Sequence, residues 1–318
     1  MMRSLILMLA VSCSAAISQA VIVGTGDGTQ NTTGTGMSSG WDYVGTVDGA
    51  SGVYLRDGWV LTAAHVGSIT PNSTTFRLSG TTYTADTGAT RLRNSDNSVT
   101  DLQLFHLKTS PALTPLPLAS STPAAGTEIF MVGYGRTPRN ISATYYDVNT
   151  STDPYTWTVR PSSDTANAGG FGYGTSQAKR WGTNTISGTD LVNAGHGDTS
   201  VLLADFYGSD LASGLQAYLD GTPGTTYEAI LSSGDSGGGV FDSQGVLVGI
   251  NNYLELYSGQ PANTAVFGNL SDMADISVYR SQILAVIPEP AATMVLSSVV
   301  LLVLSRRARA SSITDARQ

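Results

Sequence analysis

The sequence predicts an all-β protein that ends in one helix. Apolar and β-branched runs of a few residues recur along the chain and are separated by Gly, Asn, Asp, Ser and Pro, which is the pattern of a sandwich or barrel of short strands. Glycine alone accounts for 36 of the 318 residues, which favours many tight turns. We expect the strands at 53–55, 59–62, 75–78, 102–107, 128–132, 200–206, 239–241 and 246–250.

The remaining elements are a helix and two long loops. The helix is predicted over 276–286, immediately before Pro288, and a shorter helical turn over 63–66. Segments 29–39 and 147–167 are low in hydrophobic residues and rich in Thr, Ser, Gly and Asn, so we predict loops there.

The first 20 residues have the three parts of a secretory signal peptide. Arg3 supplies the positive charge, residues 5–11 form the apolar region, and the small residues around Ala20 provide a cleavage site. We therefore predict an exported protein whose main domain spans 21–287.

The C-terminal segment 288–309 resembles a sorting signal. Pro288-Glu289-Pro290 precedes the apolar run 291–304, which as a helix would rise only about 21 Å, less than the roughly 30 Å hydrocarbon core of a bilayer. Arginines follow at 306, 307 and 309, and a polar tail at 310–318. This arrangement resembles the PEP-CTERM signal of Gram-negative bacteria. The resemblance implies transient membrane association, processing by an exosortase, and delivery to the cell surface or extracellular matrix. A plain tail anchor is the alternative.

Charge and cysteine content exclude several classes of function. The chain has 16 Lys and Arg against 24 Asp and Glu, a formal net charge of −8, which disfavours nucleic acid and anionic membranes as partners. The only cysteine is Cys13, inside the predicted signal peptide. The exported protein would therefore contain no disulfide, thiolate zinc site or catalytic thiol.

The stretch LSSGDSGGGVF, residues 231–241, places one acid and one hydroxyl among glycines. It could form an ordinary surface turn, because Gly, Asp and Ser are common turn formers. The alternative is a nucleophile, Ser236, on a tight loop. The N–H groups of Gly234 and Ser236 would then bind a developing oxyanion, and glycine at 234 would leave room for the substrate.

A serine nucleophile needs a general base, and the chain has only three histidines. His106 lies inside an apolar run, and His196 lies in a Gly-rich loop. His65 follows a strand-like run and has small neighbours that would let an imidazole enter a crowded cleft. His65 is therefore the predicted base. Three scattered histidines lack metal-ligand spacing, so we expect no metal site and no cofactor; calcium binding by loop carboxylates stays open.

Leu61-Thr62-Ala63-Ala64-His65 and Gly234-Asp235-Ser236-Gly237-Gly238 together resemble the trypsin-like (chymotrypsin-fold) serine proteases. The resemblance implies two six-stranded antiparallel β-barrels, a C-terminal helix and a triad in the chain order His, Asp, Ser. Asp101, directly before the apolar run 102–107, matches the family's Asp, with Asp96 as its nearest rival. The implied function is a serine endopeptidase that acts on polypeptides without a cofactor. Residues 136–200 have little counterpart in the family.

The resemblance also assigns residues to the substrate pocket. Ile230 corresponds to the pocket floor, and Tyr253 and Leu254 to the wall. Asp272 is a further candidate that could reach the pocket from the opposite side. An aliphatic floor cannot pair with a cation, so we predict cleavage after small or aliphatic residues rather than after Arg or Lys. Ser232 stands where the family usually has a cysteine that braces this pocket.

Val21-Ile22-Val23-Gly24 resembles the mature N-terminus of the family, where a freed α-amino group pairs with the Asp before the nucleophile. The resemblance implies an activation ion pair between Ile22 and Asp235. Cleavage after Ala20 would leave Val21 in front of Ile22, one residue too many for that register. Alternatively, Ile22 and Val23 are simply the first strand.

Three other functions compete with an endopeptidase. A catalytically inactive homologue would bind peptides without cleaving them, and a structural component would serve the extracellular matrix. An esterase would use the same triad, since fold alone does not decide the substrate.

Overall fold

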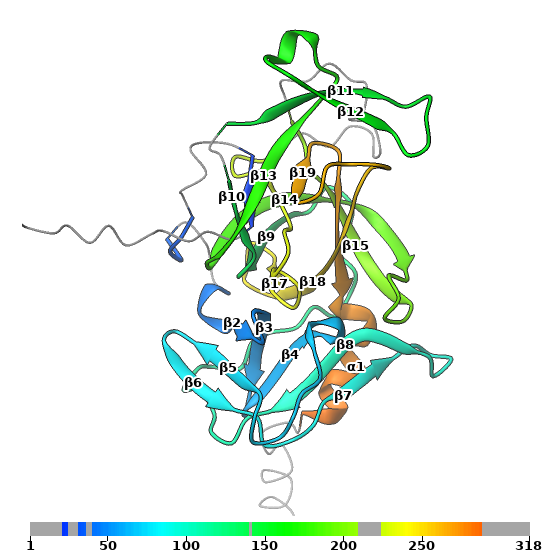
Figure 1. The fold of residues 1–318 in the computed structure, drawn as a ribbon. Helices are drawn as coiled ribbons and strands as arrows, with labels where there is room; N and C mark the ends of the chain where they lie inside the picture. Colours follow the sequence, from blue (N-terminus) through cyan, green and yellow to red (C-terminus); the bar gives the residue numbers. More distant parts are fainter. Residues whose placement is uncertain (1–20, 25–30, 36–39, 140–141, 209–223, 288–318) are drawn as a thin grey trace, which may run out of the picture.

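The computed structural model describes residues 21–24, 31–35, 40–139, 142–208 and 224–287 (Figure 1). The predicted signal peptide at 1–20, the predicted sorting segment at 288–309 and the tail at 310–318 lie outside the described residues. Among the helices of the described ranges, none is both long and apolar enough to span a bilayer.

The chain forms two β-rich halves, one above the other in Figure 1. The N-terminal half is one antiparallel sheet in the order β6-β5-β2-β3-β4-β8-β7. Its strands are β2 (Val44–Val47), β3 (Ala50–Arg56), β4 (Trp59–Ala63), β5 (Thr75–Leu78), β6 (Thr81–Thr84), β7 (Thr90–Arg93) and β8 (Val99–His106).

This sheet differs from the expected six-stranded barrel in two respects. It has seven strands, and its two outermost strands do not pair with each other. The sheet curls around a cluster that includes Val47, Phe76 and Phe105. Its nearest approach to closure is an isolated bridge between Ala85 and Leu107, just beyond β6 and β8. Because β7 adds to the outer side of β8, it extends the sheet past this point and leaves an edge.

The C-terminal half confirms the second expected barrel, which is closed and six-stranded in the order β14-β15-β20-β18-β17-β9. The strands are β9 (Glu128–Gly133), β14 (Arg180–Val192), β15 (Thr199–Asp205), β17 (Gly239–Phe241), β18 (Leu247–Glu255) and β20 (Leu270–Asp275). Its interior is filled by apolar side chains, among them Met131, Leu202, Val240 and Met273.

A smaller sheet projects from this barrel at the top of Figure 1. It contains β10 (Arg136–Pro138), β11 (Thr144–Asn149), β12 (Thr156–Arg160), β13 (Ala168–Gln177) and β19 (Thr264–Val266). The predicted loop over 147–167 is therefore wrong in part, because β11 and β12 form a hairpin there. The contact between Tyr146 and Trp157, at 5.4 Å between ring centroids, helps hold the hairpin together.

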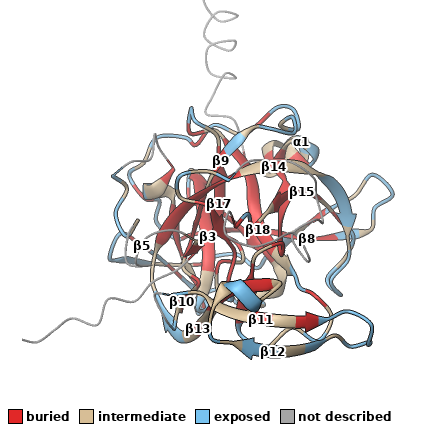
Figure 2. Cartoon of the chain, turned by 90° about the horizontal axis from the view of Figure 1, so that it is seen from above, coloured by how far each residue is buried: buried red, intermediate tan, exposed pale blue. Residues whose placement is uncertain are grey.

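The helix α1 (Ile276–Val286) has the predicted bounds. Asp275 caps it by accepting a hydrogen bond from the Ser277 N–H, which satisfies one of the free donors of the first turn. Ile276, Tyr279 and Ile283 are buried in the largest apolar cluster, which draws on both halves (Figure 2). The helix and this shared core hold the two halves together.

Candidate active site

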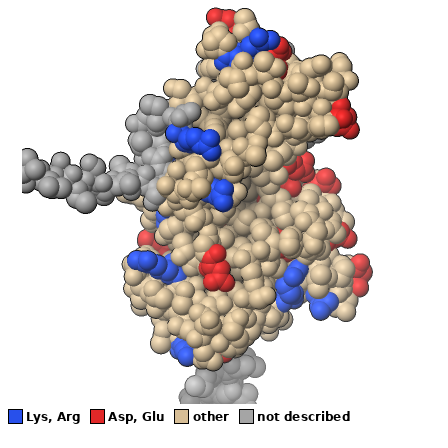
Figure 3. Space-filling model, in the orientation of Figure 1, with Lys and Arg blue, Asp and Glu red and all other residues tan. Residues whose placement is uncertain are grey.

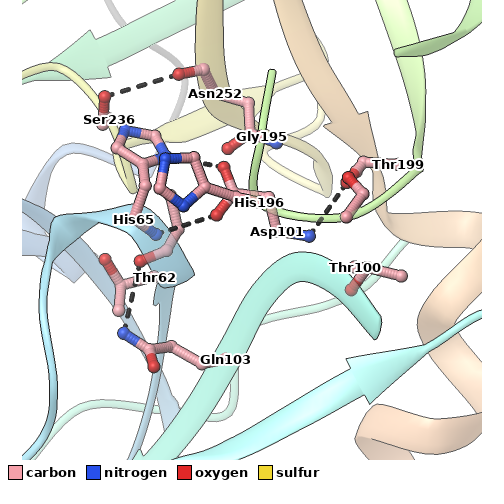
Figure 4. Close-up of polar contacts among 12 residues, drawn as sticks. Thr62, His65, Thr100, Asp101, Gln103, Gly195, His196, Thr199, Ser236 and Asn252 are labelled. Carbon is pink, nitrogen blue, oxygen red and sulfur yellow. Dashed lines mark hydrogen bonds and ion pairs between the residues drawn. The ribbon is translucent and has the colours of Figure 1, made fainter. Parts of the chain in front are cut away.

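His65 and Asp101 are brought together by the pairing of β4 with β8. Ala63 at the end of β4 lies opposite Leu102, and His65 follows in the short turn η2 (Ala64–Val66). His65 Nδ1 lies 2.6 Å from Asp101 Oδ2, and the His65 backbone N–H donates to Asp101 Oδ1 at 2.8 Å (Figure 4). An Nδ1–H donated to the carboxylate leaves Nε2 with a free lone pair, which is what a general base needs.

The Asp101 carboxylate is fully buried, so it holds the histidine from inside the protein. The backbone N–H of Asp101 donates to Thr199 Oγ1 at 2.9 Å, which anchors β8 to the first residue of β15. Gln103 supports the histidine turn from below, with its Nε2 donating to the Gly67 carbonyl at 2.9 Å. Asp96, the rival acid, is exposed and accepts its hydrogen bonds from Ser98 instead.

Ser236 lies on the loop between β16 (Ala229–Ile230) and β17. Its side chain and that of His65 line the same cleft, together with Ser233 and Gly234. The Ser236 hydroxyl donates to the Asn252 carbonyl in a long hydrogen bond of 3.4 Å (Figure 4). Catalytic hydrogen bonds are often loose in this way before substrate binds.

The loop around Ser236 requires glycine. Gly234 has φ +101°, and a Cβ there would lie 2.9 Å from the Tyr134 carbonyl. Gly237 has φ +85°, and its Cβ would overlap the Ser51 carbonyl at 2.1 Å. The backbone therefore turns so sharply because it packs directly against two other segments.

Ser51, on β3, fastens this loop to the N-terminal half, and the sequence offered no signal for it. Its N–H donates to the Ser236 carbonyl at 2.9 Å, and its hydroxyl donates to the Gly234 carbonyl at 2.8 Å. With both carbonyls held on this side, the N–H groups of Gly234 and Ser236 make no backbone hydrogen bond within the described part of the chain. The loop can therefore offer two donors to an oxyanion in the cleft.

Asp235 is completely buried behind the loop. Its carboxylate accepts hydrogen bonds from Gly135 N–H at 2.7 Å, from Ser232 N–H at 2.8 Å and from the backbone of Val21. Burial raises the pKa of Asp235 to about 6, and these donors only partly oppose the effect. Gly133 and Gly135 are needed here because a Cβ on either would lie 2.2 Å from a carboxylate oxygen.

In the uncleaved chain, the residue at Asp235 is Val21, whereas the predicted ion pair involves Ile22. Ile22 pairs with Ile230 in the two-stranded sheet formed by β1 (Ile22–Val23) and β16, and it does not face Asp235. The nitrogen beside the Asp235 carboxylate is that of Val21.

The predicted pocket residues fall into two groups. Ile230 is fully buried in an apolar cluster with Ile22, Phe171 and Phe206, and Leu254 packs against that cluster. Tyr253 instead stacks on His65, with ring centroids 5.5 Å apart and planes inclined by 23°. Burial, and then the nearby Asp101 carboxylate, raises the pKa of Tyr253 well above its ordinary value.

Asp272, the fourth predicted pocket residue, lies apart from the apolar cluster of Ile230. Its neighbour Ser271 points toward the pocket base, where Ser271 Oγ accepts from the Leu231 N–H at 3.2 Å. Successive side chains of a strand point to opposite faces, so Asp272 lies on the other face of β20. There it pairs across the sheet with Tyr253.

His196 is the second residue that the sequence did not suggest for the site. It lies at the tip of the β14–β15 hairpin, and its ring is 5.4 Å from that of His65. Arg91 holds the tip in place by donating to the His196 carbonyl at 2.6 Å. Only the register of these two long strands could have shown that the tip reaches the active-site cleft.

No group of three or more His, Cys, Asp or Glu side chains is arranged to hold a metal ion in the described ranges. The site itself offers an oriented imidazole, a hydroxyl in the same cleft and two backbone donors. This arrangement suits acyl transfer through a covalent serine intermediate.

Comparison with known proteins gives the following similarities. The family model described as "Trypsin-like peptidase domain" matches residues 50–250, more than half of the chain, and this range includes His65, Asp101 and Ser236. No curated protein matches the chain.

Several solved structures are also similar. Neuropsin, a serine protease expressed in the limbic system of mouse brain, is 18% identical with a TM-score of 0.44, over 78% of this chain and 95% of neuropsin. The inactive form of the Rv3671c protease of M. tuberculosis is 15% identical with a TM-score of 0.41, over 79% and 91% of the two chains. Human heparin binding protein is 15% identical with a TM-score of 0.45, over 79% and 94%.

Proposed function

The chain belongs to the trypsin-like peptidase domain family, a family of serine proteases, and from this premise we propose that it is a serine endopeptidase with His65, Asp101 and Ser236 as its catalytic triad. One observation carries the proposal: the His65 ring is bonded to a fully buried Asp101 and lines the same cleft as Ser236. An inactive binding protein would need neither the oriented imidazole nor the hydroxyl beside it.

In the proposed reaction, Ser236 Oγ attacks the carbonyl carbon of the scissile peptide bond while His65 Nε2 takes the hydroxyl proton. The N–H groups of Gly234 and Ser236 bind the oxyanion, and loss of one such donor costs roughly 3–4 kcal/mol of transition-state stabilisation. The C–N bond then breaks, and His65 gives its proton to the leaving amine. In the second half of the reaction, a water molecule attacks the acyl carbon while His65 Nε2 takes one of its protons. The ester C–O bond then breaks, and the proton returns to Ser236 Oγ.

The aliphatic environment of Ile230 and Leu254 supports a preference for small or aliphatic residues before the scissile bond. Support comes from the apolar cluster around Ile230, which contains no carboxylate, and from Ser271, whose hydroxyl rather than Asp272 faces the Leu231 N–H. Burying an unpaired cation among these side chains would be costly.

A peptide-library digest tests both the activity and this preference. We expect the purified protein to cleave internal bonds after small or aliphatic residues, and the Ser236→Ala protein to leave the library intact. Efficient cleavage after Arg or Lys would overturn the preference. Hydrolysis of simple esters with an untouched peptide library would favour the esterase, and failure of a fluorophosphonate probe to label Ser236 would favour the inactive homologue.

We also propose that cleavage between Ala20 and Val21 completes the active form. Val21 is fully buried, and its backbone nitrogen already contacts the Asp235 carboxylate. Cleavage at the predicted signal-peptide site would turn this amide into a charged amino group without moving it. The ion pair would stabilise the shape of the oxyanion loop, because a buried unpaired carboxylate is expensive.

The pH dependence follows from the direction of each shift. In the uncleaved chain, burial raises the Asp235 pKa from 3.8 to about 6, so the folded state binds its proton more tightly than the unfolded state does. The stability that this proton provides is complete below pH 3.8 and is lost as the pH rises to 6. In the cleaved chain the partner is an α-amino group whose ordinary pKa is about 8; pairing raises that value. Its stabilisation is therefore present at neutral pH and is lost above about pH 8.

Forms that begin at Ala20, Val21 and Ile22 check this register, each prepared with a free N-terminus and titrated with a fluorophosphonate. We expect the form that begins at Val21 to have the largest fraction of active sites at pH 7, and that fraction to fall at alkaline pH. The other two forms differ by one residue and are its controls. Equal active fractions in all three would show that internal donors alone hold Asp235.

For the two ends of the chain we propose export through the signal peptide at 1–20, followed by exosortase-type sorting at 288–309 with transient membrane contact. Both segments lie outside the described residues, so the support is the sequence pattern. Mass spectrometry of the protein recovered from the cell surface or matrix would identify both processing sites.

A further inference from the structure

A second group of carboxylates lies beside the proposed active site, on the outer face of the C-terminal barrel. Tyr253 links the two places, because it stacks on His65 and pairs across the sheet with Asp272. Glu255 is two residues further along β18, and Asp190 comes from β14. In Figure 3, acidic side chains gather along the right-hand edge at the height where the two halves of the molecule meet.

Asp272 is the unusual member of this group. It has no exposed surface, and within the described part of the chain its carboxyl oxygens meet no donor other than the carboxyl group of Glu255. The charges that act on it, from Glu255 and Asp190, are both negative. Burial first, and then these charges, raise the pKa of Asp272 to about 8, and the proton that Asp272 holds is shared in a hydrogen bond with Glu255.

Burying a carboxyl group whose partner is only another carboxyl group costs folding free energy. An apolar residue could have filled this buried position on the outer face of the barrel. A cation placed between Asp272 and Glu255 would remove this cost by pairing with both. Arg91, a basic side chain whose charge acts on Tyr253, already donates to the carbonyls of Thr100 and His196. Among the described residues, no ion pair is formed with Asp272, Glu255 or Asp190.

The position of the group indicates which cation reaches it. The last part of β18 leads away from Ser236. Asn252, whose carbonyl contacts Ser236, is followed by Leu254 at the pocket and by Glu255 at the end of the strand. A substrate whose side chain enters beside Leu254 would lay the preceding residues along this strand. Three residues of extended chain cover about 10 Å. A long basic side chain two or three residues before the bond would therefore come within reach of Glu255.

We propose that Asp272 and Glu255, with Asp190 at the rim, form a subsite for a Lys or Arg side chain two or three residues before the scissile bond. The proposal rests on the proposed peptidase function and gives it a composite specificity: an aliphatic residue at the bond and a basic residue upstream of it. Acidic and neutral side chains at the upstream position would leave Asp272 unpaired.

Peptide binding to the inactive Ser236→Ala protein tests the subsite without relying on hydrolysis. Dye-labelled peptides would carry an aliphatic residue at the bond and either arginine or its neutral isostere citrulline three residues before it. We expect the arginine peptide to bind about tenfold more tightly at low salt, as for one partly buried ion pair, and this advantage to shrink as salt is added.

Adding Asp272→Asn or Glu255→Gln should abolish the difference between arginine and citrulline, whereas Asp57→Asn, an exposed carboxylate paired with Arg56 elsewhere, should preserve it. Circular dichroism would confirm that each variant is folded. Equal binding of both peptides, or an arginine advantage that survives both substitutions, would overturn the subsite. Failure of the wild-type protein to hydrolyse any peptide would count against the peptidase proposal instead, so the two failures are distinguishable.

Discussion

The Ser236→Ala protein is expected to lose about 10⁶-fold in turnover, the loss that follows removal of the nucleophile from a serine protease. Without Oγ no acyl-enzyme forms, and the two backbone donors of the loop can stabilise only slow attack by water. His65→Ala should cost about as much, because an unassisted serine hydroxyl is a weak nucleophile. Single-turnover hydrolysis of a peptide substrate and fluorophosphonate labelling measure both effects.

Both variants should keep the native fold. Ser236 and His65 are only partly buried and line a cleft, so their removal leaves no cavity in the core. Thermal unfolding and circular dichroism are the matched controls. Residual peptide hydrolysis within tenfold of wild type in a folded Ser236→Ala protein would mean that Ser236 is not the nucleophile.

The Asp101→Asn protein is expected to lose about 10⁴-fold in turnover with little change in fold. An asparagine that accepts at the Asp101 position from the His65 backbone N–H would turn its NH₂ toward Nδ1. His65 would then carry its proton on Nε2, facing Ser236, and could no longer take the serine proton. The rate loss should be accompanied by reduced fluorophosphonate labelling.

Asp96→Asn is the control for this substitution, because the sequence offers Asp96 as the alternative to Asp101 for the acid of the triad. Asp96 bonds only within its own turn, to Ser98. Hydrogen bonds from Ser98 lower the pKa of Asp96, so its replacement should affect that turn and leave turnover near wild type. An inactive Asp96→Asn protein beside a nearly normal Asp101→Asn protein would reverse the assignment.

The described residues contain no cysteine, so the loop that carries Ser236 is held without disulfides, and hydrogen bonds from two serines do this. Ser51 binds the carbonyls of Gly234 and Ser236. Ser232, which stands where the family usually has a bracing cysteine, has its hydroxyl within 3.0 Å of both the Arg136 carbonyl and the Asp235 carboxylate. Noncovalent bracing of this kind suits a chain whose only cysteine is Cys13.

The elements that the sequence predicted well are those whose signal is local. The alternation and turn residues that indicated an all-β chain depend on near neighbours along the chain, and so does the helix at 276–286, which has the predicted bounds. The motifs around His65 and Ser236 are also local, because each is a tight loop that needs small residues within a few positions. The hairpin at 144–160 was missed because its polar strands are stabilised by Trp157 and Tyr257, which meet only in the folded protein.

Tertiary structure decided whatever depends on the register between distant strands. The bulge between Asn251 and Tyr253 sets Tyr253 opposite Asp272, and one residue of slip would turn each side chain to the other face. The register between β1 and β16 likewise decides that the nitrogen of Val21, rather than that of Ile22, lies beside Asp235. The pairing of β7 with β8 decides that the N-terminal sheet is open. The sequence by itself therefore determined the class of fold and the two loops that carry His65 and Ser236. Their juxtaposition, the partner of Asp235 and the face that Asp272 occupies came from long-range strand pairing, which no local pattern encodes.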